Sequence, residues 1–230
     1  MGKAMTEQGM IGFRIRSGLP RPDAALVEQF RGLATPNIAD AMGRFHFMDP
    51  RIRQRSGLAL CGVAVTVNAR PADNLMVHKA LQVAQTGDIV VVCTNGNTTS
   101  AVFGDLMCRS AVGARLGGIV VDGAIRDIEG ITALGFPAFS RTVCAGACDK
   151  DGPGEINVPI ACGNTVVMPG DIVMGDGDGI VVVPREEAAE VHRLVLELVE
   201  RERKRVAEIT AGVLFKGEID ETLRKKGVLP

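Results

Sequence analysis

The hydrophobic positions in the middle of the chain form short apolar runs that alternate with amphipathic stretches. Residues 89–93 and 119–121 are apolar throughout, which is typical of strands buried on both faces of a parallel sheet. Each run follows a glycine turn and precedes a polar loop and a helical pattern. This order predicts a βαβα unit with a parallel sheet.

The remaining elements follow from the same periodicities and from their end signals. Thr35 is expected to cap a helix that has Pro36 at its first position. The acidic turn 176–179 is expected to join two strands, because it lacks the spacing of a full EF-hand loop. We expect helices over 23–33, 35–42, 74–84, 105–116, 127–134, 185–211 and 220–225, and further strands over 61–67, 166–167, 172–174 and 180–183.

The 230 residues divide into three segments. Residues 1–22 hold several glycines and show no periodicity, so they predict an N-terminal arm without assigned regular structure. Residues 23–184 predict a single α/β catalytic domain. Residues 185–230 predict a long C-terminal helical extension.

Composition excludes several classes of protein. The net charge of −1, with acids and bases mixed, argues against a nucleic-acid binder. No apolar stretch reaches the ~18 residues of a membrane helix, and residues 1–16 lack the apolar run of a secretory signal. The six cysteines show no metal-binding spacing. We therefore expect a cytoplasmic protein with reduced thiols that binds neither nucleic acid nor a membrane.

Candidate chemistry lies in two loops that follow neighbouring strands. Residues 104–107 and 126–127 each stand at the start of a predicted helix, and parallel strands bring such loops to one edge of the sheet. A helix N-terminus suits a carboxylate, and Arg126 offers a planar fork for an oxyanion. Asp127 is a hard oxygen ligand suited to Mg²⁺ or Mn²⁺.

A structural interpretation of the same residues stays open at this point. Asp105, Asp122 and Asp127 are each at a position where an aspartate could simply cap a helix. Arg126 could pair with a surface acid. Spacing alone does not separate these interpretations from a functional site.

Several sequence blocks occur together in one order. They are DNL at 73–75, GDL at 104–106, GGIVVDGAIRD at 117–127, PGEINVPI at 153–160 and the stretch from 169 to 184. In this order they resemble the 4-hydroxy-4-methyl-2-oxoglutarate / 4-carboxy-4-hydroxy-2-oxoadipate aldolases, which belong with the RraA-like proteins. The resemblance covers about residues 35–184 and is weaker in the C-terminal helix.

The resemblance implies a fold and an assembly. The fold would be an α/β/β/α sandwich that resembles the swivelling phosphohistidine domain. The chain would form homotrimers or homohexamers with active sites between neighbouring subunits.

The resemblance also implies roles for individual residues. Asp127 would bind Mg²⁺, Mn²⁺ or another divalent metal, and Arg126 would contact the enolate oxygen. Asp105 would order the water chain that moves protons. Glu202 of a neighbouring subunit would join the outer shell of the metal. The residues expected to bind substrate are Asn74, Gly104, Asp105, Leu106, Met107 and Arg126, with His78 on the same helix as Asn74.

The implied activity is that of a class II pyruvate aldolase, a carbon–carbon lyase. It would cleave 4-hydroxy-2-oxo-dicarboxylates, such as the two named above, to pyruvate and a keto acid, with oxaloacetate decarboxylation as a side activity. No lysine stands out as a buried Schiff-base former. The alternative is an RraA-like protein-binding regulator of ribonuclease activity. Those regulators lack the acid equivalent to Asp105 and the long C-terminal extension.

Overall fold

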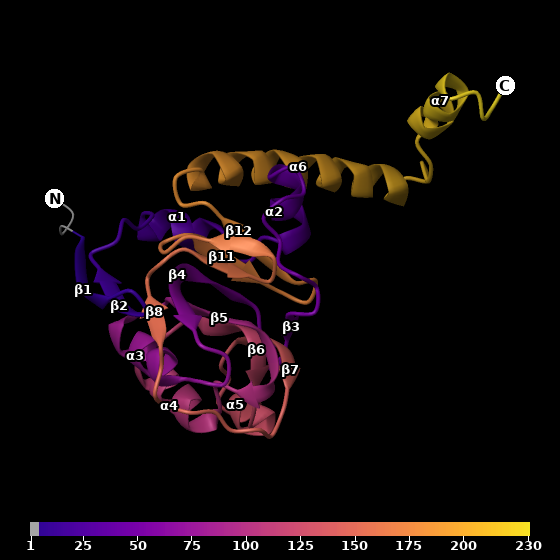
Figure 1. Cartoon of the computed structure of the whole chain (residues 1–230). Helices are drawn as coiled ribbons and strands as arrows, with labels where there is room; N and C mark the ends of the chain where they lie inside the picture. Colours follow the sequence, from indigo (N-terminus) through magenta and orange to yellow (C-terminus); the bar gives the residue numbers. More distant parts are fainter. Residues whose placement is uncertain (1–4) are drawn as a thin grey trace.

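Four parallel strands form the centre of the sheet in the computed structural model, which describes residues 5–230 (Figure 1). They are β4 (Leu60–Ala69), β5 (Ile89–Ala101), β6 (Gly118–Ile125) and β7 (Ala138–Val143). Val90 of β5 lies between Val65 of β4 and Ile119 of β6, so the apolar runs stand side by side in register. The predicted parallel α/β arrangement is confirmed.

Shorter strands extend this sheet on both sides. Beyond β4 follow β8 (Gly154–Ile156), β2 (Phe13–Ser17) and β1 (Thr6–Met10), and beyond β7 lies β3 (Arg53–Gln54). The hairpin of β11 (Ile172–Gly175) and β12 (Ile180–Val183) pairs with the start of β4. A separate ladder joins β9 (Ile160–Cys162) to β10 (Thr165–Val167).

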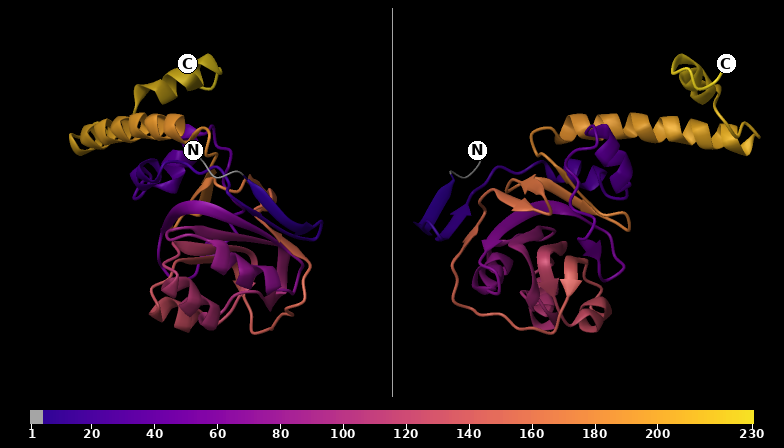
Figure 2. Two further views of the ribbon diagram at one scale, coloured as in Figure 1. Left: turned by 90° about the vertical axis from the view of Figure 1, so that its left-hand side faces the viewer. Right: turned by 45° about the vertical axis from the view of Figure 1, so that its right-hand side comes forward.

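Helices cover both outer sides of this strand assembly, as Figures 1 and 2 show. On one side lie α3 (Leu75–Val83), α4 (Asp105–Gly113) and α5 (Ile128–Ala133). On the other side, beyond the β11–β12 hairpin, lie α1 (Ala24–Gln29), α2 (Thr35–Ala41) and α6 (Ala188–Thr210). The order of layers is helix, sheet, hairpins, helix, and the likeness to the swivelling phosphohistidine domain stays a prediction.

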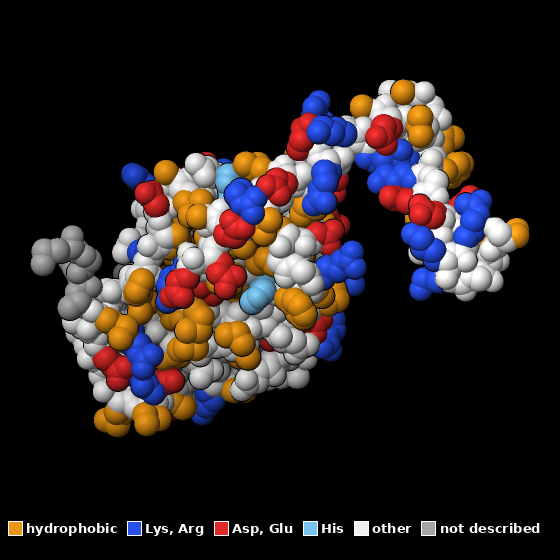
Figure 3. Space-filling model, turned by 90° about the horizontal axis from the view of Figure 1, so that it is seen from above, with side chains coloured by type: hydrophobic (Ala, Val, Ile, Leu, Met, Phe, Trp, Pro, Cys, Tyr) orange, Lys and Arg blue, Asp and Glu red, His pale blue; other side chains and the backbone are white. Residues whose placement is uncertain are grey.

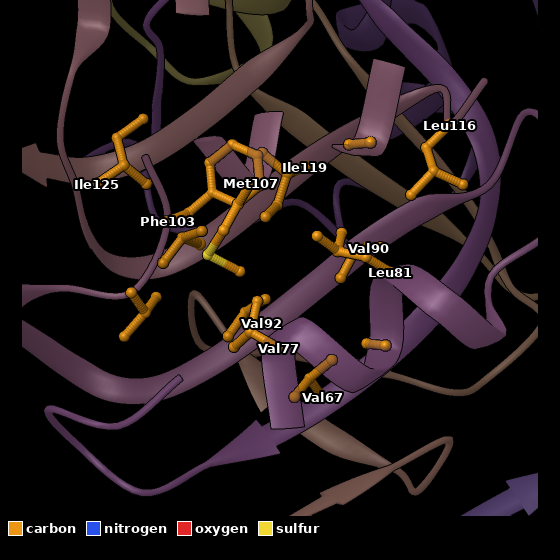
Figure 4. Packing of buried hydrophobic residues seen from close by; sticks show 14 of the residues in the cluster. Val67, Val77, Leu81, Val90, Val92, Phe103, Met107, Leu116, Ile119 and Ile125 are labelled. Carbon is orange, nitrogen blue, oxygen red and sulfur yellow. The ribbon is translucent and has the colours of Figure 1, made fainter. Parts of the chain in front are cut away.

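Three clusters of buried side chains hold these layers together. The first packs α3, α4 and α5 on the sheet and includes Val90, Phe103 and Met107 (Figure 4). The second lies between the sheet and the hairpins, and the third between the β11–β12 hairpin and helices α1, α2 and α6. Because consecutive residues of β5 and β6 point into different clusters, both faces of these strands are buried.

The N-terminal segment is more regular than its pattern predicts. β1 and β2 form an antiparallel hairpin, and β2 joins β8 in parallel. Every residue of β1 is exposed, and β2 has no fully buried residue. A strand without a buried face shows no apolar alternation, which is why residues 1–22 gave no strand prediction. Residues 1–4 lie outside the described part of the chain.

Two loop predictions are wrong at the ends of the central strands. β5 continues to Ala101, through most of the segment predicted as a polar loop, and β6 continues to Ile125. Their register shifts between Cys93 and Asn97, where Asn95 and Gly96 adopt positive φ angles. Such a bulge bends the strand and interrupts its alternation, so the hydrophobic pattern ends before the strand does.

The cap of α2 differs from the prediction. Thr35 is the first helical residue and Ala34 occupies the N-cap position. The backbone N–H and the hydroxyl of Thr35 both donate to the carboxylate of Asp176, at 2.9 and 2.7 Å. Asp176 belongs to the turn between β11 and β12, as predicted, so this turn satisfies the start of α2 from across the fold.

The C-terminal extension leaves the body of the molecule along α6. Only Ala188, Val191 and Val195 of this helix are buried. The last 28 residues, 203–230, are called the C-terminal arm here and include α7 (Gly217–Lys225), which has no buried residue (Figure 3). None of the described helices has the length and apolarity needed to cross a membrane.

Candidate functional site

A cavity of about 270 Å³ opens at the carboxyl ends of β5 and β6, on the side of the sheet that α3, α4 and α5 cover. Its walls come from the starts of α3 and α4, the β6–α5 junction and the loop after β7. It is lined by Asn74, His78, Ala101, Phe103, Gly104, Asp105, Leu106, Met107, Arg126, Asp127, Ala147, Cys148 and Lys150. The structure thus brings together the residues expected from the two loops.

Asp127 stands at the turn between β6 and α5 with a left-handed backbone (φ 58°). Aspartate tolerates this conformation better than most residues because its short polar side chain bonds locally. The side chain makes no cap bond to α5 and instead reaches α4, where Oδ2 accepts the Asp105 N–H at 3.2 Å. Arg126 Nε lies 3.5 Å from the same oxygen, and both side chains are close to half exposed.

Gly104 allows this close approach. A Cβ atom at position 104 would lie 2.5 Å from Asp127 Oδ2 and 3.3 Å from Arg126 Nε. A side chain at position 104 would displace the Asp127 carboxylate, so glycine lets the Arg126 and Asp127 side chains lie against the start of α4 as observed.

The cap interpretation of Asp105 is wrong, because Gly104 is the N-cap of α4 and Asp105 is its first residue. In the part of the chain that the structure describes, the one ion-pair partner of Asp105 is Arg109, at 3.6 Å, and the side chain is about one-third exposed (31 %). Asp122 is likewise no cap, since it is buried inside β6. Asp105 therefore lines the cavity with a carboxylate that accepts no hydrogen bond within the described chain and pairs with Arg109 alone.

The start of α4 offers backbone donors beside these side chains. The first intrahelical bond runs from Cys108 N to Gly104 O, so the N–H groups of Leu106 and Met107 precede it. Met107 is anchored in the first cluster, whereas Leu106 is 75 % exposed. This rigid helix start can accept an anionic group.

Asn74 forms the inner wall of the cavity and is 6 % exposed. Its side-chain amide donates to Val102 O at 3.3 Å, while its Oδ1 is buried without a hydrogen-bond partner among the described residues. A buried acceptor of this kind is costly unless a bound molecule supplies a donor. His78 lines the cavity one turn further along α3, and burial, followed by the nearby charge of Lys150, lowers its pKa.

The loop with Cys148 and Lys150 was missed as part of the site. It is tied to α3 by Asp73, whose buried carboxylate accepts the N–H groups of Asp151 and Gly152 at 2.8 Å and of Leu75 at 2.9 Å. The DNL block at 73–75 is the signal that points to it, since a buried aspartate needs several donors. Lys150 is exposed, so the absence of a buried Schiff-base lysine holds for this cavity.

The donor set suits a metal that keeps most of its own water. Among residues 5–230 there is no group of three or more His, Cys, Asp or Glu side chains that could hold an ion by themselves. Asp127 supplies one exposed carboxylate in the open cavity, and Mg²⁺ typically takes one or two protein carboxylates. The residues present therefore fit a weakly held hard cation.

Glu202 lies apart from this cavity within one chain. It stands on α6, in the helical layer opposite α4 and α5 (Figure 1), and its carboxylate accepts the side-chain amide of Asn37 at 2.7 Å. A role for Glu202 at Asp127 would need a second copy of the chain.

Comparisons with known proteins converge on one family. The family model RraA-like (Aldolase/RraA) matches residues 35–182. A Halalkalibacterium halodurans protein with the provisional name 4-hydroxy-4-methyl-2-oxoglutarate aldolase is 39 % identical over 166 residues, which is 72 % of this chain and 79 % of that protein.

Two solved structures have a similar fold. An unusual member of the RNase ES inhibitor RraA family from Streptomyces coelicolor has a TM-score of 0.74 at 26 % identity, over 82 % of this chain and all of that one. The RNA-processing inhibitor RraA from Thermus thermophilis has a TM-score of 0.61 at 25 % identity, over 66 % of this chain and 92 % of that one.

Asp73 makes the loop with Lys150 sensitive to pH. Burial alone would raise its pKa, but backbone N–H groups and Arg70 bring the pKa below its usual value of 3.8. The ionised carboxylate therefore stabilises the fold above pH ~4, and this contribution is lost as the pH falls through the lowered pKa. Asp73→Asn should reduce the free energy of unfolding at pH 7 by about 2 kcal/mol, because an amide N–H would face backbone donors.

The difference in melting temperature between the wild type and Asp73→Asn should shrink toward pH 3. Asp149→Asn is the control, since that carboxylate is 76 % exposed and lies 3.5 Å from Arg70. A deficit of the Asp73 variant that is the same at pH 7 and pH 3 would refute the proposed role of its charge.

Proposed function

Because the chain belongs to the RraA-like family of aldolase and RraA proteins, we propose that it is a divalent-metal-dependent pyruvate aldolase. Its substrates are 4-hydroxy-2-oxo-dicarboxylates such as 4-hydroxy-4-methyl-2-oxoglutarate or 4-carboxy-4-hydroxy-2-oxoadipate. The products are pyruvate and a second keto acid.

One observation supports this proposal above the others. Asp105 lines a cavity beside Arg126 and Asp127, and its carboxylate neither caps a helix nor accepts a hydrogen bond from any residue of 5–230; its one charged contact there is Arg109, at 3.6 Å. A surface that only binds another protein has no need for an acid, a guanidinium and free helix N–H groups in one small hollow. Acid–base chemistry on a small anion needs all three.

The cavity has the size and polarity for a small dicarboxylate. In the proposed binding mode, the carboxylate of the pyruvyl unit accepts the N–H groups of Leu106 and Met107, and its 2-oxo oxygen faces Arg126. The second carboxylate then lies toward His78 and Lys150, which line the remaining wall. The buried Oδ1 of Asn74 accepts a hydroxyl or a water of the bound substrate.

The chain's own groups handle the charge and the proton of a retro-aldol cleavage. Asp105, through a water, takes the proton of the C4 hydroxyl. As the C4 carbonyl forms, the C3–C4 bond breaks, and its electron pair forms the C2=C3 bond of pyruvate enolate. The negative charge on the 2-oxo oxygen is stabilised by Arg126. The proton then returns to C3 and completes pyruvate.

Asp127 would hold Mg²⁺, Mn²⁺ or another divalent cation, which supplies Lewis-acid polarisation of the 2-oxo group when bound. The same enolate results when oxaloacetate loses carbon dioxide, so oxaloacetate decarboxylation is the expected side activity.

A homo-oligomer, either a trimer or a hexamer, completes the proposed site. Beyond Glu202 the C-terminal arm extends from the body with Val206, Ile209, Leu214 and Phe215 exposed. Exposed apolar side chains on a projecting helix are typical of a surface that a partner covers. We propose that a second copy of the chain covers the arm. Glu202 then reaches the outer shell of the metal that Asp127 of this second copy holds.

The alternative function is that of a protein-binding regulator of ribonuclease activity. It is supported by the similarity in fold to the two RraA structures. The test of Asp105 below separates it from the aldolase, because such a regulator makes no use of an acid in the cavity.

Among the predictions for the proposed aldol reaction, the first concerns Asp105→Asn. The melting temperature should stay close to that of the wild type, because Gly104 is the N-cap and Arg109 is 3.6 Å away. The kcat for pyruvate release should fall by about 10²-fold or more, the usual scale for an acid–base group. Glu129→Gln is the control, since it removes an exposed carboxylate of α5 that does not line the cavity. Wild-type kcat in Asp105→Asn would favour the regulator.

The second prediction is metal dependence. One exposed carboxylate and water should bind Mg²⁺ weakly and exchange it readily. Incubation with EDTA should therefore abolish pyruvate release, measured with lactate dehydrogenase, and Mg²⁺ or Mn²⁺ should restore it. Full activity after exhaustive chelation would exclude the metal from the mechanism.

The third prediction is complementation between subunits. Glu202→Ala protomers mixed with Asp127→Asn protomers should regain activity on subunit exchange. Some sites then combine the intact Asp127 of the first variant with the intact Glu202 of the second. Asn keeps the left-handed conformation accessible at position 127. Arg126→Gln mixed with Asp127→Asn is the control and should stay inactive. If neither mixture regains activity in demonstrably mixed oligomers, the site lies within one subunit.

A further inference from the structure

A second and larger hollow, of about 910 Å³, opens at the same edge of the sheet but on its other face. Its walls are β3, the ends of β5, β6 and β7, and the β9–β10 ladder. Asp122 and Arg141 project there from β6 and β7 on the side of the second cluster. No step of the proposed aldol reaction uses any of its residues.

Arginines dominate this hollow. Arg51, Arg53, Arg55 and Arg141 line it, and Asp122 is the one acid in the lining. Asparagine and threonine side chains supply most of the remaining polar surface.

Two of the four arginines are already paired. Arg141 donates to Asp122 through Nε and to Asp49 Oδ2 at 3.1 Å, and it is 11 % exposed. Arg51 donates to the same Asp49 oxygen at 2.6 Å. The second oxygen of Asp122 accepts the N–H of Gly163 at 2.8 Å, so this network fixes the floor of the hollow.

The other two arginines, Arg53 and Arg55, have no carboxylate within 4.0 Å among residues 5–230. Arg53 Nε reaches only Pro50 O, at 3.2 Å. Arg55 donates to the hydroxyl and carbonyl of Ser140 and to Arg141 O, between 2.6 and 3.0 Å. Burial, followed by repulsion from Arg53, lowers the pKa of Arg55.

These cations are placed for an external anion. Arg55 is half-buried and held only by neutral oxygens, so it lacks the counter-charge that normally offsets desolvation, while Arg53 beside it is exposed. The four guanidinium groups have two carboxylates near them, those of Asp49 and Asp122, so two positive charges remain without a counter-charge. Guanidinium forks match phosphate oxygens in geometry as well as in charge.

We infer that this hollow is a binding site for the phosphate ester of a small hydroxylated molecule. Arg53 and Arg55 hold the phosphate dianion, and Asn95, Thr98 and Asn164 bond the hydroxyl groups. The volume exceeds that of phosphate alone, and no aromatic side chain lines the hollow to stack on a base. The site is separate from the cavity at Asp127 and does not depend on the aldolase proposal.

Calorimetric titration of the full-length protein with glucose 6-phosphate tests the site, with inorganic phosphate and glucose as further probes. We expect glucose 6-phosphate to bind, phosphate to bind more weakly and glucose not to bind. Arg53→Gln should raise the Kd about tenfold or more, as expected for the loss of a charged hydrogen bond. Arg53 has no buried partner, so this variant keeps its fold even if Arg55→Gln does not.

Two controls make the result specific. Arg115→Gln removes an exposed guanidinium before β6, at the opposite edge of the sheet, and should leave the Kd unchanged. Arg126→Gln should also bind normally, because it alters only the other cavity. No binding by the wild type at millimolar ligand, an unchanged Kd in Arg53→Gln, or loss of binding in Arg126→Gln would each overturn the proposal. So would an Arg53→Gln variant that binds normally but changes the mass of the oligomer, because the hollow would then be an interface between copies.

Discussion

Burial of β5 and β6 on both faces is the constraint on which the rest of this structure depends. Their apolar runs are enclosed by the first cluster on one side and the second on the other. Polar side chains of these two strands can therefore reach solvent only near the strand ends, before helices α4 and α5 begin. This is why the cavity at Asp127 and the arginine hollow both open at the carboxyl edge of the sheet.

β6 serves both hollows because side chains alternate along a strand. Asp122 points toward the second cluster and anchors Arg141, while Arg126 and Asp127 follow the last strand residue and turn toward α4. The bulged end of β5 separates the two hollows. One strand thus supplies residues to two hollows that share no lining residue.

The sequence predicts those parts of the site that depend on chain order. Asp105, Arg126 and Asp127 meet because each follows a parallel strand, and parallel strands end at one edge. Lys150 comes to the same cavity because Asp73 binds the N–H of the next residue, Asp151, and no periodicity encodes a contact across 78 positions. The arginine hollow was missed for a related reason: within residues 51–55 only Arg53 and Gln54 form a strand, and two residues are too few to show a pattern.

The exposed end of α6 has a consequence for cooperativity. None of the three clusters contains a residue beyond Val195, and the ion pairs of the C-terminal arm are local, such as Arg203 with Glu200 and Arg205 with Glu208. Within one chain, then, the arm is not part of the cooperative unit formed by the sheet and its helices. The helicity of the arm depends on local ion pairs, which salt screens. Because the arm contributes to none of the buried clusters, changes in its length or sequence leave the stability of the body nearly untouched.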